Sequence, residues 1–190
     1  MKMVLRVGLG LVGLVVIVLG VKQFATGIRE VSGKRTTQPQ KLGETYTSTE
    51  NGYTHRIPQG WGRKAGPQPG VTMIVAPKES GFASNMVTTV EPFDGSLRAY
   101  TDANIKSIQA NVPGAKILSD TEFVTDSKMS GYKLKLQNKV KNIALAQTMY
   151  LFDGPSGKKI IVTCTTPSER APQLEPLLDE CMKTFALSGR

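Results

Sequence analysis

The chain has 190 residues, a formal net charge of +9, one histidine and two cysteines. This length suits one domain with an anchor and a linker, and it does not suit two full domains. So few histidines and cysteines exclude a zinc site of the usual kind, in which most ligands are His or Cys.

The N-terminus carries an apolar run from Val7 to Val21 that has no polar side chain. Together with residues 3–6 this run makes a helix about 28 Å long, which is just enough to span a bilayer. We therefore expect residues 1–25 to form an uncleaved signal anchor and transmembrane helix. A signal peptide cleaved after Gly20 or Gly27 is the alternative. The apolar side chains of the segment include Val7, Leu11, Leu14, Ile17 and Val21.

Residues 26–51 are rich in Gly, Ser, Thr, Lys and Gln, which predicts a flexible basic linker. Its cations either contact anionic lipid head groups or are only solvated. Basic residues flank the apolar run on both sides, so the charge count does not decide which side of the membrane the rest of the chain faces. Residues 52–190 are expected to form one globular domain.

From Tyr53 onward the pattern changes to short β-type runs that are separated by prolines and glycines. Ser96 then caps a predicted helix, whose apolar residues recur at helical spacing up to Val112. Pro113 and Gly114 end this helix. The strands predicted before it are Tyr53–Ile57, Val71–Ala76 and Asn85–Glu91.

The second half of the domain contains more strands and a final helix. Leu134 and Leu136 alternate with Lys133 and Lys135, which is typical of a strand with one buried face. Strands in series, with one helix inserted and one at the end, predict an α+β domain: an antiparallel sheet with helices packed on it. The strands predicted here are Lys116–Thr125, Gly131–Gln137, Ile143–Phe152 and Lys159–Thr166, and the final helix carries Leu174, Leu177, Leu178, Cys181, Met182 and Phe185.

The segment Tyr53–Trp61, with Pro58, resembles the opening motif of PsbP-like and DcrB-like domains. Gly81–Val90, in which Asn85 leads into a strand, resembles their second signature. The order of the later elements is also similar, so that the resemblance covers Tyr53 to Leu187. It implies an α/β/α sandwich around an antiparallel sheet, and members that are mostly binding modules and not enzymes. No lipobox cysteine follows the apolar run, which sets the chain apart from envelope lipoproteins.

His55 is the one histidine and a candidate ligand or proton carrier, although a structural role is the favoured interpretation. Asp120, Glu122 and Asp126 have a spacing that fits alternate faces of a strand and a turn better than a calcium loop. We find no nucleophile–base pair and no phosphate-binding loop. The sequence therefore predicts no enzyme activity, no metal and no cofactor.

The two cysteines, Cys164 and Cys181, lie on a predicted strand and on the apolar face of the last helix. If that helix packs on that strand, the sulfurs meet, and a disulfide would add about 3 kcal/mol in the chain-entropy model. The alternative is a pair of reduced core cysteines.

Several lysines lie on adjacent predicted hairpins and suggest a docking patch for an acidic protein or for anionic head groups. The alternative is a solvated sheet edge that lysines protect from aggregation. Nucleic acid is not expected, because the aromatic residues do not interleave with the lysines. The lysines of this predicted patch are Lys128, Lys133, Lys135, Lys139, Lys141, Lys158 and Lys159.

These features predict a single-pass protein of the inner (cytoplasmic) membrane with its domain on the periplasmic side, which the family resemblance favours. The expected function is that of a non-enzymatic accessory or stabilising subunit that docks onto a larger membrane protein complex. The alternative is an envelope binding module, or a secretion-type chaperone or adaptor that grips a client protein. The expected partners are a membrane complex or another envelope protein and the bilayer, with no small-molecule substrate.

Overall fold

The computed structural model describes residues 41–66, 70–79 and 81–188. The predicted membrane segment of residues 1–25 lies outside the described residues, and so does most of the predicted linker. Within the described ranges, no helix has both the length and the apolar character needed to cross a membrane. The anchor therefore stays a prediction.

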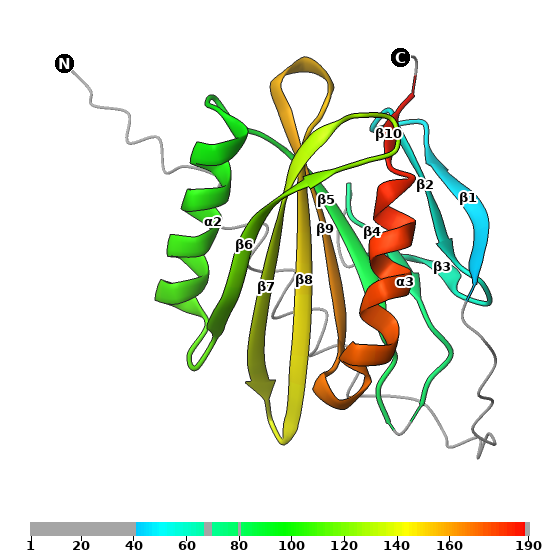
Figure 1. Ribbon diagram of the computed structural model, residues 1–190, viewed down its shortest axis with the longest axis vertical. Coiled ribbons are helices and arrows are strands. Elements are labelled where there is room, and N and C mark those ends of the chain that lie inside the picture. Colours follow the sequence, from blue (N-terminus) through cyan, green and yellow to red (C-terminus); the bar gives the residue numbers. More distant parts are fainter. Residues whose placement is uncertain (1–40, 67–69, 80, 189–190) are drawn as a thin grey trace.

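Two antiparallel sheets form the domain (Figure 1). The large sheet has seven strands in the order β3-β4-β5-β9-β8-β7-β6, and the small sheet has three in the order β1-β2-β10. The large sheet consists of β3 (Gly62–Ala65), β4 (Thr72–Val75), β5 (Asn85–Pro92), β6 (Lys116–Val124), β7 (Ser130–Val140), β8 (Ile143–Asp153) and β9 (Lys158–Pro167). The small sheet consists of β1 (Leu42–Ser48), β2 (Tyr53–Pro58) and β10 (Ala186–Leu187).

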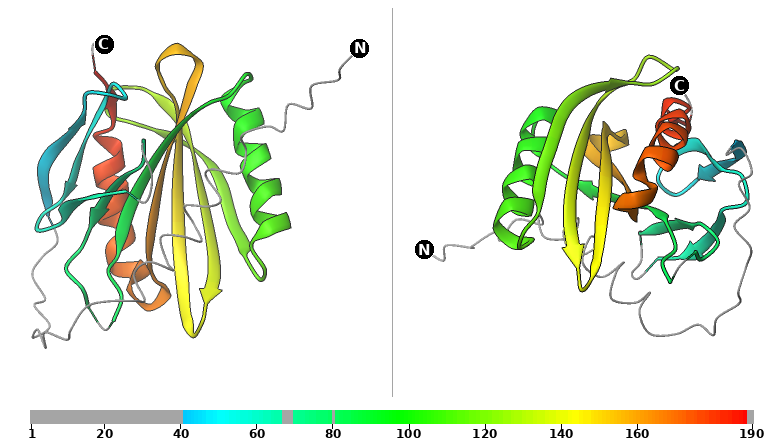
Figure 2. Two further views of the ribbon diagram at one scale, coloured as in Figure 1. Left: turned by 180° about the vertical axis from the view of Figure 1, so that it is seen from behind. Right: turned by 60° about the horizontal axis from the view of Figure 1, so that its bottom comes forward.

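The two α-helices of the described residues lie on opposite faces of the large sheet, as Figure 2 shows. Helix α2 (Leu97–Asn111) covers one face, whereas α3 (Ala171–Lys183) and the small sheet cover the other. Two short 3-10 turns, Pro155–Gly157 and Ser168–Arg170, precede β9 and α3. The predicted α+β fold, an antiparallel sheet with helices packed on it, is confirmed.

Apolar side chains of β8 point alternately to the two faces of the large sheet, and both faces are buried. Tyr150 and Phe152 pack into the cluster beneath α3, while Met149 and Leu151 pack into the cluster beneath α2. This follows from the two-residue period of a strand, which sends successive side chains to opposite faces. The sheet is therefore the central layer of the domain, with an apolar core on each side.

Helix α2 begins where the sequence predicted. The Ser96 hydroxyl accepts a hydrogen bond from the backbone N–H of Ala99 at 3.1 Å, which satisfies one of the free donors of the first turn. Leu97, Tyr100 and Ile108 are buried against the sheet at helical spacing.

The first strand differs from expectation, because β1 lies inside the segment that we predicted as a flexible linker. Tyr46 is buried in the α3-side core, and β1 pairs with β2 along most of its length. The local composition of β1 is polar, so its order depends on pairing with β2 rather than on an apolar pattern of its own. Strands β3 and β10 were also not predicted; all four residues of β3 are exposed, and β10 has two residues.

Candidate functional site

The lysines of β7 that face α3 form ion pairs with that helix. Lys133 Nζ lies 2.6 Å from Asp179 Oδ1 and 3.3 Å from Glu175 Oε1, and Lys135 Nζ lies 2.5 Å from the same Glu175 oxygen. Glu175 and Asp179 are four residues apart, so both lie on one face of α3. These two lysines therefore attach α3 to the sheet.

Tyr150 lies beneath this ion-pair network and is completely buried. Its hydroxyl donates a hydrogen bond to the Asp179 carboxylate, and Lys133 Nζ lies 5.8 Å from the centre of its ring. Burial, with further contributions from nearby Cys164 and Asp179, raises the pKa of Tyr150 far above its usual range. The phenol is thus a permanent donor to Asp179. Sequence reasoning missed this network, although the four-residue spacing of two carboxylates on α3 was a visible signal.

The other predicted patch lysines lie in different parts of the molecule. Lys159 is only 5% exposed, and its Nζ lies 2.5 Å from Asp153 Oδ1. Lys158 is half-buried at the start of β9, and Lys128 lies in the β6–β7 turn with a φ of 64°. The seven lysines therefore do not share one face, because the eleven-residue strands β7 and β8 hold the lysines of their two ends apart and α3 covers part of the face.

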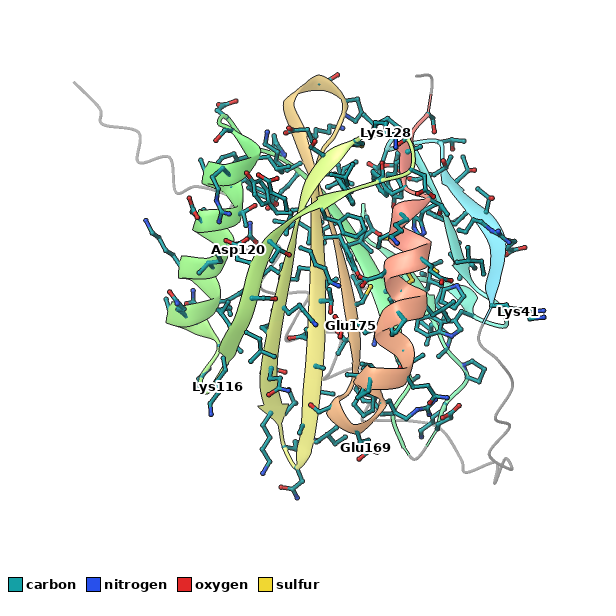
Figure 3. The ribbon with its side chains drawn as sticks, in the orientation of Figure 1. Lys41, Lys116, Asp120, Lys128, Glu169 and Glu175 are labelled. Atoms are coloured by element: carbon teal, nitrogen blue, oxygen red, sulfur yellow. The ribbon has the colours of Figure 1, made fainter. Side chains whose placement is uncertain are left out.

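Like Lys128, two further patch lysines are exposed and have no ion pair among the described residues. Lys139 lies near the end of β7, and Lys141 lies in the β7–β8 turn. Lys116 at the start of β6 is exposed as well, and its pairing with Gln137 places it close to Lys139. We call Lys116, Lys139 and Lys141 the basic tip. Figure 3 shows Lys116 at this end of the sheet and Lys128 at the opposite end. Docking through lysines stays a prediction.

A hollow of about 100 Å³ lies between α3 and the sheet, next to the basic tip. We call it the α3 hollow. Small side chains of β8 and β9 lie on one side of it, Ala171, Glu175 and Leu178 of α3 on the other, and Leu118 of β6 at its margin. The residues of the sheet that line it are Leu118, Lys135, Leu136, Gln137, Ala146, Gln147, Thr148, Cys164 and Thr166.

The hollow results from a change in side-chain size along β8. On the α3 side this strand presents Ala144, Ala146 and Thr148 toward the basic tip, but Tyr150 and Phe152 toward the other end. The aromatic rings fill the space beneath α3, whereas the alanines do not. Leu118, which lines the hollow, is 54% exposed, so the space reaches the molecular surface.

Cys164 and Cys181 are both buried in the α3-side core, and both thiols are free. The helix does pack on the strand as expected, but the disulfide is not formed in this structure. Burial raises the pKa of Cys181 to about 12, and burial together with the neighbouring Cys181 raises the pKa of Cys164 well above its usual value. Neutral thiols of this kind are poor nucleophiles.

His55 is 1% exposed and packs among aromatic rings. Its ring stacks on Tyr53 at 6.1 Å and on Phe185 at 6.3 Å, and its Nδ1 lies 2.9 Å from the Arg56 carbonyl oxygen. Burial lowers its pKa, so the ring is neutral and Nδ1 donates to that carbonyl. No side chain of the described part of the chain hydrogen-bonds to the ring, which supports a structural role.

The acidic residues do not gather into a metal site. Asp120 forms an ion pair with Arg98 of α2 at 2.7 Å. Among residues 41–66, 70–79 and 81–188, no group of three or more His, Cys, Asp or Glu side chains has a geometry that could hold a metal ion.

Comparison with known proteins identifies the domain. Three solved structures share its fold at low sequence identity. The cyanobacterial PsbP (CyanoP) of Synechocystis sp. PCC 6803 has a TM-score of 0.54 at 17% identity, with 83% of this chain and 98% of that chain covered. LpqN of Mycobacterium tuberculosis, described as involved in cell envelope biogenesis, has a TM-score of 0.57 at 12% identity, with 80% of this chain and 87% of that chain covered. PA94 of Pseudomonas aeruginosa, a protein of unknown function described as a putative regulator, has a TM-score of 0.55 at 17% identity, with 80% of this chain and 99% of that chain covered.

Among curated protein sequences, none matches the chain. The family model of DcrB, in contrast, matches residues 54–184, which is most of the described domain. The match begins and ends within the limits that the sequence motifs predicted, and it confirms the resemblance found there. The chain therefore belongs to the DcrB family.

Proposed function

We propose that this protein is a membrane-anchored, non-enzymatic accessory or stabilising subunit, whose DcrB domain docks onto a larger membrane protein complex on the periplasmic side of the inner membrane. The observation that carries the proposal is a surface at one end of the sheet. There, Leu118 is 54% exposed beside the α3 hollow, and the neighbouring basic tip has no ion pairs among the described residues. The hollow, the exposed Leu118 beside it and the unpaired cations together form the surface that we assign to the partner.

A binding function agrees with the chemistry of the buried titratable groups. Lys133 and Lys159 are neutralised by carboxylates, and His55 has no side-chain partner in the described part of the chain. Burial raises the pKa of both cysteine thiols, which disfavours the thiolate that a nucleophile needs. These groups stabilise the domain and are not arranged for acid–base or nucleophilic catalysis.

An envelope location is supported by the apolar run at the N-terminus and by the shared fold of LpqN, a protein involved in cell envelope biogenesis. If residues 1–25 are retained in the membrane, residues 26–40 connect the anchor to the domain. Fully extended, fifteen residues reach at most about 50 Å. The start of the domain at Lys41 would then lie within that distance of the bilayer.

The test is purification of the tagged full-length chain from membranes in a mild detergent, with identification of the co-purifying proteins by mass spectrometry. We expect an integral membrane complex in a fixed stoichiometry with the chain. Carbonate extraction of the same membranes checks the anchor, since a retained anchor keeps the chain in the pellet.

Three results would contradict the proposal. A chain that purifies alone from intact membranes is not a subunit, and a soluble client bound in variable amounts would favour the adaptor function. Loss of an activity on substitution of a single Ser, Cys or His would instead indicate an enzyme.

A further inference from the structure

The α3 hollow is too small for a cofactor or a drug-sized ligand, which occupy pockets of roughly 300–1,000 Å³. Its volume is about 100 Å³. The end of one leucine or methionine side chain occupies a similar space. Ala146, Cys164 and Leu178 give the hollow an apolar lining that suits such a side chain.

A β-bulge places Leu118 at the margin of this hollow. In the pairing of β6 with β7, Ile117 lies opposite Leu136 and Ser119 lies opposite Lys135, so that Leu118 is the extra residue. Bulges redirect side chains and occur frequently beside functional sites. Leu118 is exposed on an edge strand, where it adds apolar surface to the rim of the hollow.

The charges around the hollow are unbalanced. Glu175 is already paired with Lys133 and Lys135. Lys116 and Lys139 are exposed and have no acidic partner in the described part of the chain, while Glu169 is an exposed carboxylate two residues before the wall of the hollow. The three cations of the basic tip outnumber this one carboxylate, which favours an acidic partner.

We infer that the α3 hollow receives one leucine or methionine side chain from an acidic segment of the partner protein, with Leu118 covering that side chain and the basic tip pairing with the flanking carboxylates. This inference rests on the proposed function, for which it names the docking site and the chemistry of the partner. An apolar anchor in a pocket, surrounded by polar contacts that exclude water, is the usual arrangement of an interface hot spot.

The first experiment replaces Leu118 with a photo-crosslinking amino acid in the full-length chain and irradiates intact membranes. Mass spectrometry then identifies the crosslinked segment. We expect a segment of another protein with a leucine or methionine and at least two Asp or Glu residues nearby. The same crosslinker at Ala110, an exposed residue of α2, is the matched control and should not capture that segment.

The second experiment titrates a synthetic peptide of that segment into the purified full-length chain in detergent. Ala146→Leu fills the hollow and should weaken binding at least about ten-fold, whereas Ala110→Leu adds the same atoms to an exposed helix face and should leave Kd unchanged. Lys139→Glu should weaken binding several-fold and reduce its salt dependence. A peptide with its leucine or methionine replaced by alanine should bind the unsubstituted chain as weakly as the original peptide binds Ala146→Leu.

Leu118→Asp changes an exposed side chain at the rim of the hollow, so it tests partner binding even if Ala146→Leu disturbs folding. Thermal unfolding of each variant shows whether the variant is folded. The inference is overturned if Leu118 crosslinks to residues 1–40 of the same chain, to a second copy or to a basic segment, or if nothing is captured. It is also overturned if the membrane complex co-purifies with Ala146→Leu and Leu118→Asp as it does with the unsubstituted chain. The proposed function fails separately, when no membrane complex co-purifies with the unsubstituted chain.

Discussion

Strand β7 carries lysines at both of its ends on the same face, and the two ends have different roles. Lys133 and Lys135 pair with Glu175 and Asp179 of α3, whereas Lys139 near the other end is exposed and has no ion pair among the described residues. Side chains of β7 alternate between the two faces of the sheet along its whole length, so the sequence pattern of the strand does not distinguish these lysines. The difference lies in what covers them, because the acidic face of α3 lies above one end of the strand only.

The same contrast appears in the layer beneath α3. Tyr150 and Phe152 fill the space at the end where the lysines are paired, and Ala146 leaves the α3 hollow between Lys135 and the end where Lys139 is free. One end of β7 therefore contributes to stability and the other is available for binding. Substitutions at the paired end should lower the free energy of unfolding, and substitutions at the free end should leave it nearly unchanged.

The largest effect is expected for Asp179→Ala. This change removes the acceptor of the buried Tyr150 hydroxyl and the partner of Lys133, and hydrogen bonds to charged groups contribute about 1.5–3 kcal/mol each. We expect the free energy of unfolding to fall by about 2–3 kcal/mol, measured by urea unfolding with the fluorescence of Trp61, the one tryptophan. Asp179→Asn keeps an acceptor for Tyr150 and should lose less. A loss below about 0.5 kcal/mol for Asp179→Ala would remove the distinction between the two ends.

A smaller effect is expected when the paired lysines are replaced by methionine, which keeps the length of the side chain. The Lys133 side chain is 14% exposed and contacts two carboxylates, whereas the Lys135 side chain is 36% exposed and contacts one. Lys133→Met should destabilise the domain by about 1–2 kcal/mol, and Lys135→Met by less than about 1 kcal/mol. If both variants lose the same free energy of unfolding in the urea assay, the burial of the lysine does not determine how much each ion pair stabilises the domain.

His55 gives the covered side of the domain a pH dependence that the basic tip, which has no histidine, does not share. Its pKa is lowered in the folded protein by burial, while in the unfolded chain it is near the ordinary value of about 6.5. The unfolded chain therefore binds the proton first, and stability should fall as the pH decreases through that value. His55→Phe should flatten the dependence of the urea midpoint between pH 7.5 and 5. An unchanged slope in this variant would assign the pH dependence to other groups.

The smallest effects are expected at the basic tip. Lys139→Glu should change the free energy of unfolding by no more than about 0.5 kcal/mol, because the side chain is exposed and has no ion pair in the described ranges. Lys141 has a φ of 54°, in the left-handed region that asparagine tolerates better than lysine. Lys141→Asn should therefore raise stability by a few tenths of a kcal/mol. A loss above about 1 kcal/mol at either position would mean that the tip has a structural role.

The sequence by itself determined the elements whose patterns are local. Ser96 and the apolar spacing after it predicted α2, and the alternation of Leu134 and Leu136 with lysines predicted β7 together with its buried face. The motifs at Tyr53–Trp61 and Gly81–Val90 also indicated the family that the comparison with DcrB confirms. These features are readable because helical and strand periods and caps involve residues close together in the chain.

The tertiary structure alone decided which side chains meet. Strand β1 is ordered by its pairing with β2, although its composition predicts a linker. Whether a lysine of β7 forms an ion pair depends on where α3 crosses the sheet. Lys133 pairs with Asp179, which is 46 residues away in the chain. Lys139 contacts no carboxylate in the described part of the domain. Contacts between residues so far apart leave no periodic trace in the sequence, because they depend on how the helix is positioned on the sheet. The α3 hollow has the same origin, since it lies where Ala146 and Thr148 of β8, and not the aromatic rings of Tyr150 and Phe152, lie beneath α3.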